Sequence, residues 1–307
     1  MAAIETRGLT KRYGDNVIAV DDLGLTVEEG EIFGFLGPNG AGKSTTIDLL
    51  LDYVRPTAGS ATVLGHDAQT ETEAIHERIG ILPDDYGLYR RLSGRDHVEY
   101  AIDLKGADDD PDALLDRVGL DREAADRPVG GYSTGMAQRL VLAVALVGDP
   151  DLLILDEPSS GLDPNGVRMV REVARETVAR GGTVFFSSYI LPQVEAVADR
   201  VAILDRGQLV AVDTIDVLRS SLATGTTLTV TAADTPEGVD LGDVPGVEAT
   251  TVDGRTITVS CTTPEAKVEA FDAIRNAGVT VLDFSTSEAS LEELFRAYTV
   301  GSEESDR

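Results

Sequence analysis

The stretch "GPNGAGKST", residues Gly37 to Thr45, is the strongest indication in the sequence of how this chain folds. It fits the pattern G-x-x-x-x-G-K-[ST] and lies between an apolar run typical of a buried strand and a helical pattern. Its glycines let successive backbone N–H groups curl around a phosphate chain, and the start of a helix adds partial positive charge. We expect Lys43 to reach the β- and γ-phosphates of a nucleotide and Ser44 to offer its hydroxyl to Mg²⁺. The predicted phosphate-binding residues are Gly37, Pro38, Asn39, Gly40, Ala41, Gly42, Lys43, Ser44 and Thr45.

The stretch "DLLILDEP" (Asp151–Pro158) is an apolar run that ends in two carboxylates. Ligands bind at the carboxyl ends of the strands in a parallel sheet, so these side chains are expected near the phosphates. Asp156 suits a water-mediated contact to Mg²⁺, and Glu157 suits a general base that orients the attacking water. Such a pair alone is equally well explained as a solvated strand end. Together with the glycine-rich loop it predicts a P-loop nucleotidase.

The composition favours a globular chain of one large or two modest domains, because 42% of its 307 residues are apolar. The longest apolar run, Leu140–Val147, is far shorter than the roughly 20 residues of a membrane span. No secretory signal pattern is present, and the single cysteine, Cys261, excludes an internal disulfide framework. We therefore expect the chain to reach a membrane only through a partner.

The charge is strongly acidic: 26 basic and 54 acidic residues give a net charge of −28 and a pI near 4.3. Such a field argues against binding to nucleic acid or anionic lipid through a basic face. Abundant Asp with few Lys favours the high-salt cytoplasm of a halophile, where repulsion is screened. The alternative is a generic acidic protein.

Strand and helix patterns alternate over the first two thirds of the chain, as in an α/β protein with a mostly parallel sheet. The block at about residues 86–147 differs, because its apolar residues recur at three-to-four spacing and predict a helical subdomain. The predicted strands of the parallel sheet include Glu31–Leu36, Leu152–Leu155, Thr183–Phe186 and Arg200–Leu204.

Beyond residue 222 the pattern predicts a small C-terminal α+β domain over residues 223–300, followed by an acidic tail at 301–307. Two stretches alternate with period two, and Asp253-Gly254 lies where a tight hairpin turn belongs. The remaining predicted elements are a helix at Pro264–Ala277, a strand near Val279–Phe284 and a helix at Ala289–Tyr298.

Two further motifs indicate which class of P-loop nucleotidase this chain belongs to. "YSTGMAQRL" (Tyr132–Leu140) opens a helix, with Ser133 as a cap and Gly135 permitting close backbone approach. "SSGLDP" (Ser159–Pro164) follows directly on the Asp-Glu pair.

With these motifs, residues 4–222 resemble the ATP-binding cassette (ABC) ATPases, with "STGMAQR" in place of the commoner signature LSGGQ. The resemblance implies a P-loop NTPase cassette that binds ATP and Mg²⁺, with Tyr13 stacked on the adenine. It also implies a head-to-tail pair with a second ABC cassette, as a homodimer or heterodimer. In that pair Ser133 and Gly135 would meet the γ-phosphate held by the partner, and Asp163 would cross the interface.

"GLYRRLSGRDHVEY" and the C-terminal "SLEELFRAYT" further resemble the ABC-2 type exporter ATPases. The resemblance implies an ATP-hydrolysing subunit on the cytoplasmic face of the cell membrane, bound to a separate transmembrane permease. The surface that grips the permease would be residues Pro83 to Leu92.

Two positions depart from the family pattern. Asp84 follows "RIGILP", where the family has Gln or Glu, and its shorter side chain makes a contact to Mg²⁺ uncertain. Tyr189 follows two serines where the family has histidine, and a phenol cannot supply positive charge. We expect Tyr189 at the catalytic site to leave ATP binding intact and to slow hydrolysis. The alternatives are that Tyr189 only packs and Glu157 suffices, that the chain is a degenerate regulatory cassette, or that it is a soluble non-transport switch.

Overall fold

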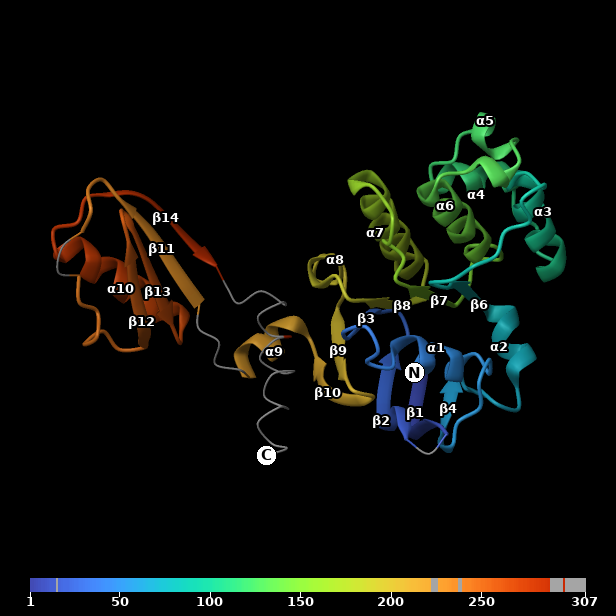
Figure 1. Ribbon diagram of the computed structural model, residues 1–307, viewed down its shortest axis with the longest axis horizontal. Helices are drawn as coiled ribbons and strands as arrows, with labels where there is room; N and C mark the ends of the chain where they lie inside the picture. The colour runs from blue at the N-terminus through green and yellow to red at the C-terminus, as the bar shows by residue number, and fades with distance from the viewer. Residues whose placement is uncertain (15, 222–225, 237–238, 288–294, 296–307) are drawn as a thin grey trace. The chain divides into compact units, whose positions relative to one another are not determined.

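The computed structural model describes residues 1–307 except 15, 222–225, 237–238, 288–294 and 296–307 (Figure 1). The chain divides into two compact units, Met1–Thr214 and Ile215–Arg307. The sequence places the boundary after residue 222, whereas this division assigns helix α9 (Ile215–Ser221) to the second unit.

The centre of the first unit is a six-stranded sheet in the order β10-β9-β3-β8-β7-β6. All neighbours are parallel except the edge strand β10, which confirms the predicted mostly parallel sheet. Every residue of β3, β7 and β8 is buried, which explains why the sequence of each strand is a mostly continuous apolar run. The polar exceptions include Asp156, at the end of β7, and Ser187 and Ser188, at the end of β8. The strands are β3 (Ile32–Leu36), β6 (Ile79–Leu82), β7 (Leu152–Asp156), β8 (Thr183–Ser188), β9 (Arg200–Asp205) and β10 (Gln208–Asp213).

A second, antiparallel sheet in the order β2-β1-β4-β5 was not predicted. Strand β2 alternates between buried and exposed residues over Leu23–Glu28 and pairs antiparallel with β1 across a short connection. Strand β1 does not alternate strictly, because register shifts interrupt this pairing. Buried residues of both sheets and of helix α1 form one core, which includes Ile4, Val20, Phe33 and Phe185. The elements are β1 (Ala2–Tyr13), β2 (Val17–Glu28), β4 (Ala58–Val63), β5 (His66–Asp67), α1 (Lys43–Leu50) and α2 (Thr72–Arg78).

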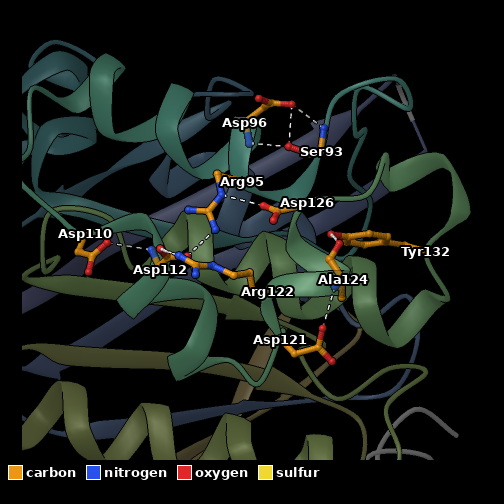
Figure 2. A network of polar contacts seen from close by, with 10 residues as sticks. All are labelled: Ser93, Arg95, Asp96, Asp110, Asp112, Asp121, Arg122, Ala124, Asp126 and Tyr132. Atoms are coloured by element: carbon orange, nitrogen blue, oxygen red, sulfur yellow. Dashed lines mark hydrogen bonds and ion pairs between the residues drawn. The ribbon is translucent and has the colours of Figure 1, made fainter.

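Helices fill the predicted helical block, and Figure 1 shows them as a group next to β6 and β7. Arg95 in α3 connects these helices, because its guanidinium forms ion pairs with Asp112 in α4 and with Asp126 directly after α5 (Figure 2). Arg122 forms a second ion pair with Asp112. The helices are α3 (Gly94–Lys105), α4 (Pro111–Arg117), α5 (Arg122–Ala125), the 3₁₀ turn η1 (Val129–Gly131) and α6 (Thr134–Ala145); α7 (Pro164–Ala179) and α8 (Leu191–Glu195) follow.

The second unit is a four-stranded antiparallel sheet, β12-β13-β11-β14, with helix α10 along one face (Figure 1). The predicted hairpin is present, since Asp253 pairs with Thr256 and Gly254 adopts φ +57° between them. The elements are β11 (Thr226–Ala232), β12 (Val247–Asp253), β13 (Thr256–Cys261), α10 (Pro264–Asn276) and β14 (Val281–Ser287). The helix predicted at 289–298 and the tail at 301–307 lie outside the described residues, apart from Phe295.

Candidate active site

The phosphate loop connects the buried strand β3 to helix α1, which begins at Lys43. Two of its glycines are obligatory on steric grounds. A Cβ on Gly42, which has φ +106°, would lie 2.2 Å from the Ala19 carbonyl oxygen, and one on Gly37 would lie 2.6 Å from that of Leu204. The loop can therefore pack against the backbone of Ala19 and Leu204 only with glycine at these two positions. Pro38, Asn39, Gly40 and Ser44 are exposed, Thr45 is half-buried and Ala41 is buried.

Lys43 is buried, with 6% of its surface exposed. Its Nζ donates to the carbonyl oxygens of Gly37 (2.8 Å) and Pro38 (3.4 Å). The same Nζ lies 3.3 Å from Oε1 of Glu157. The predicted phosphate-binding cation and the predicted general base are thus in direct contact, although 114 positions separate them in the printed sequence, 157 minus 43.

Glu157 follows β7 in a left-handed backbone conformation, φ +47°. Its backbone N–H donates to the Ser187 carbonyl (3.1 Å), and its Oε2 accepts from the Tyr189 backbone N–H (3.3 Å). Its buried Oε1 accepts no hydrogen bond from the described residues. Burial raises the pKa of Glu157, and the charge of Lys43 opposes this rise. A raised pKa is a property that a general base needs, and contact with the Lys43 ammonium places this carboxylate beside the phosphate loop.

Asp156 ends β7 and is buried, and it accepts a hydrogen bond from the Ser187 hydroxyl. Ser187 was not among the predicted site residues, although a serine at the end of the apolar run of β8 was a signal for it. Asp84 is exposed; partial burial and the charges of Asp156 and Asp85 raise its pKa. Asp84 and Asp156, the two acidic residues among the three predicted to hold Mg²⁺, therefore lie within electrostatic range of each other.

Two predicted aromatic site residues are largely accessible. Tyr189 is 51% exposed and meets Glu157 through its backbone N–H, as described above. Tyr13 is 44% exposed, and the Nζ of Lys11 lies 5.0 Å from its ring centroid. Both rings thus leave a face or edge free for a ligand.

The signature residues and Asp163 line a separate pocket of about 440 Å³. Ser133 caps α6, accepting from the Met136 backbone N–H (3.3 Å), and Asp163 caps α7, accepting from that of Gly166 (2.8 Å). The hydroxyl of Tyr132, directly before Ser133, donates to the Ala124 carbonyl (2.7 Å) (Figure 2). The pocket is lined by Ser133, Thr134, Gly135, Met136, Arg139, Gly161, Leu162 and Asp163.

The predicted residues therefore form two groups in one chain. Lys43, Asp156, Glu157, Asp84 and the Tyr189 backbone meet at the ends of β3, β7 and β8. The signature pocket has no phosphate-loop residue in its lining. The first group fits a phosphate chain and its attacking water, because it combines a glycine-rich loop, a buried cation and a carboxylate beside that cation. The oxygens of Ser44 and Asp156 fit a hard cation such as Mg²⁺.

Comparisons with known proteins agree with this chemistry. The ABC transporter family model matches residues 20–160, and the model of the C-terminal domain of DrrA1-3-like ATP-binding proteins matches residues 214–299. The daunorubicin/doxorubicin resistance ATP-binding protein DrrA of Streptomyces peucetius is 35% identical, over 97% of this chain and 92% of its own. The bacitracin transport ATP-binding protein BcrA of Bacillus licheniformis is 41% identical, over 67% of this chain and 68% of its own.

Solved structures show the same fold. An ATP-binding subunit of an ABC transporter aligns with TM-score 0.66 and 27% identity, covering 72% of this chain and 93% of its own. A dimeric ATP-binding cassette bound to ADP and phosphate aligns with TM-score 0.63 and 22% identity, covering 69% of this chain and 98% of its own. No helix among the described residues is long and apolar enough to cross a bilayer. From the site, the family models and the full-length relative together, this chain is a member of the ABC transporter ATP-binding proteins of the DrrA/ABC-2 exporter type, a family of ATPases.

Proposed function

We propose that this chain hydrolyses MgATP as one of two paired cassettes and thereby drives export through a separate transmembrane permease. The observation that carries the proposal is the contact between Lys43 and Glu157 at the end of the parallel sheet. The names of the DrrA and BcrA relatives, which refer to daunorubicin/doxorubicin resistance and to bacitracin transport, suggest a compound of that kind as cargo. Residues 83–92 are the proposed contact to the permease, at the cytoplasmic face of the membrane.

The residues of the phosphate loop have distinct roles in this proposal. The backbone of residues 37–42 and the Lys43 ammonium bind the β- and γ-phosphates, and Tyr13 packs on the adenine. Ser44, Asp156 and Asp84 would hold Mg²⁺, directly or through water, and the ion supplies charge neutralisation on the phosphates when bound. Glu157 orients the attacking water and accepts its proton.

Pairing completes the site in this proposal, because the signature pocket does not line the phosphate loop of its own chain. Ser133 and Gly135 of one copy would face the γ-phosphate on the other, and Asp163 would lie at the interface. Two ATP molecules would thus be held between two copies, or between this chain and a related cassette.

Glu157→Gln tests the proposal. The substitution removes the proton acceptor and keeps its shape, so kcat should fall by about 10²- to 10⁴-fold while ATP binding persists. ATPase activity should be measured on the purified chain alone and with its permease, together with ATP-dependent association. Glu172→Gln is the matched control, since Glu172 is an exposed carboxylate paired with Arg168 on α7. Undiminished hydrolysis in Glu157→Gln would contradict the assigned base.

A slow or regulatory cassette is the second candidate, and the identity of residue 189 favours it. Tyr189 contacts Glu157 only through its backbone N–H among the contacts described above. A tyrosine side chain cannot supply the positive charge that a protonated histidine would bring to this position. Tyr189→His should therefore raise kcat at saturating ATP, by about tenfold or more if the positioned group acts in the transition state. Steady-state hydrolysis at high salt measures this, and Tyr189→Phe controls for loss of the hydroxyl. An unchanged kcat in Tyr189→His would show that Glu157 suffices.

A further inference from the structure

Arg139 is the basic residue in the lining of the signature pocket. It belongs to helix α6, two turns after Ser133, and 18% of its side chain is exposed. None of the roles assigned above uses this guanidinium. It lies between the signature helix α6 and the loop that precedes α7.

One end of the guanidinium is anchored on backbone. Its Nη1 donates to the carbonyl oxygen of Val118 at 2.7 Å, at the C-terminal end of α4. Gly119 leaves room for it: φ is +70° there, and a Cβ would lie 2.5 Å from Nη1. The orientation of the planar group is therefore fixed by a charge-assisted hydrogen bond.

The other end faces Asp163. Nη2 of Arg139 lies 3.8 Å from Oδ1 of Asp163, the same oxygen that caps α7 through the Gly166 N–H. The Asp163 side chain is 62% exposed, and an exposed ion pair at this distance adds little to stability. The pair is better suited to setting where the carboxylate lies than to holding the fold together.

Other contacts join the same helix to the same loop. The buried Gln138 donates from Nε2 to the Pro158 carbonyl at 3.3 Å. A Cβ on Gly161, which has φ +72°, would lie 2.9 Å from Cγ2 of Thr134, so the loop approaches the start of α6 closely. The loop before α7 therefore packs directly on helix α6, and Arg139 adds an ionic contact to its last residue, Asp163.

We propose that Arg139 is a positioning residue for hydrolysis between paired cassettes: it sets Asp163 relative to Ser133 and Gly135. The signature pocket is then presented to the second copy as one preformed surface. This inference rests on the pairing proposed above. Preformed geometry matters because a displacement of about 1 Å costs up to ~10²-fold in rate when reacting groups must align.

Arg139→Gln tests the inference in the full-length chain. ATP affinity of the single chain, measured with a fluorescent ATP analogue, should change by no more than about twofold, because the phosphate loop is untouched. ATP-dependent association should weaken by about tenfold or more; it is measured by light scattering with Glu157→Gln also present, so that ATP is not consumed. In the chain with Glu157 intact, Arg139→Gln should lower kcat by a similar factor. Arg139→Lys should retain only part of the association. Its ammonium keeps the positive charge but cannot contact the Val118 carbonyl and Asp163 at the same time with a planar group.

Arg168→Gln is the matched control, since Arg168 is an exposed arginine on α7 paired with Glu172. The double variant Arg139→Gln/Asp163→Asn separates positioning from a merely structural role. If Arg139 acts through Asp163, the double variant associates as weakly as Asp163→Asn alone; additive losses overturn the inference. Normal association of Arg139→Gln also overturns it and leaves the pairing intact. A wild-type chain that never associates with ATP overturns the pairing, and the inference with it.

Discussion

Glu157 combines a left-handed backbone, burial and contact with Lys43 at one position. The left-handed conformation is uncommon for a residue other than glycine and is maintained here by the Ser187 carbonyl and the Tyr189 N–H. It directs the carboxylate towards the phosphate loop. Strain of this kind is typical of residues whose side chain must be aimed.

The raised pKa of Glu157 predicts how Glu157→Gln changes stability with pH. A raised folded pKa means that the stability associated with this group is fully present below its ordinary value of 4.5. That stability is lost as pH rises through the folded value. Without nucleotide, Glu157→Gln should therefore gain stability relative to the wild type as pH rises from 5 to 7, whatever the constant cost of leaving the Lys43 ammonium without its carboxylate. Urea unfolding between pH 5 and 8 measures it; a gain that does not depend on pH would contradict the assigned cause.

At this scale the sequence predicted the residues that a motif spells out. Lys43 and Glu157 are marked by fixed spacing and by the end of an apolar run. Ser187 ends an apolar run and Arg139 ends the stretch "STGMAQR", but neither pattern says which residue the side chain contacts. Those partners, Asp156 and Asp163, are distant in sequence and are brought close by the fold. Whether the predicted site residues act as assigned stays a prediction until the variants are measured.

Among the elements, β6 and α6 form the closest junction between the parallel sheet and the helical block. Gly80 in β6 faces the end of α6, and a Cβ there would lie 1.9 Å from the Ala145 carbonyl oxygen and 3.0 Å from Pro150. This contact allows the signature helix to end directly on the sheet. Any side chain at this position would push the helix away.

Gly80→Ala should accordingly destabilise the first unit by about 1–3 kcal/mol, because the clash is with backbone and both elements must shift. Gly24→Ala is the control: Gly24 lies in β2, has nothing within 4 Å of its would-be Cβ, and should change stability by less than about 0.5 kcal/mol. Thermal or urea unfolding of both variants measures the difference. Equal stabilities would show that β6 and α6 separate without cost.

Elements with a clear period were predicted well, and those fixed by pairing were not. The buried strands β3, β7 and β8 and helix α10 were within a few residues of their observed bounds. The strands β1, β2, β4 and β5 of the antiparallel sheet were not predicted, because register shifts in the β1–β2 and β1–β4 pairs interrupt the period-two pattern. Residues 289–298 lie, but for Phe295, outside the described part of the chain, so that helix stays a prediction.

For the whole molecule, the net charge of −28 is the dominant electrostatic feature. Its 54 acidic residues repel one another in dilute buffer, and the screening length falls from about 10 Å at 0.1 M salt to about 3 Å at 1 M. We predict that the urea midpoint rises across this range. NaCl and KCl at equal concentration should act alike, because screening does not depend on cation identity. Full stability in dilute buffer would contradict the predicted high-salt setting.

The second unit has a core of its own, which includes Leu228, Val230, Ile257 and Ile274, all from that unit. A hydrophobic core formed by one continuous stretch of chain affects how the protein can evolve as well as how it folds. Such a stretch can be gained, lost or exchanged between genes as a piece, since the residues of this core all come from one continuous part of the chain. Evolution can therefore vary the appendage while the machinery around Lys43 and Glu157 is inherited unchanged.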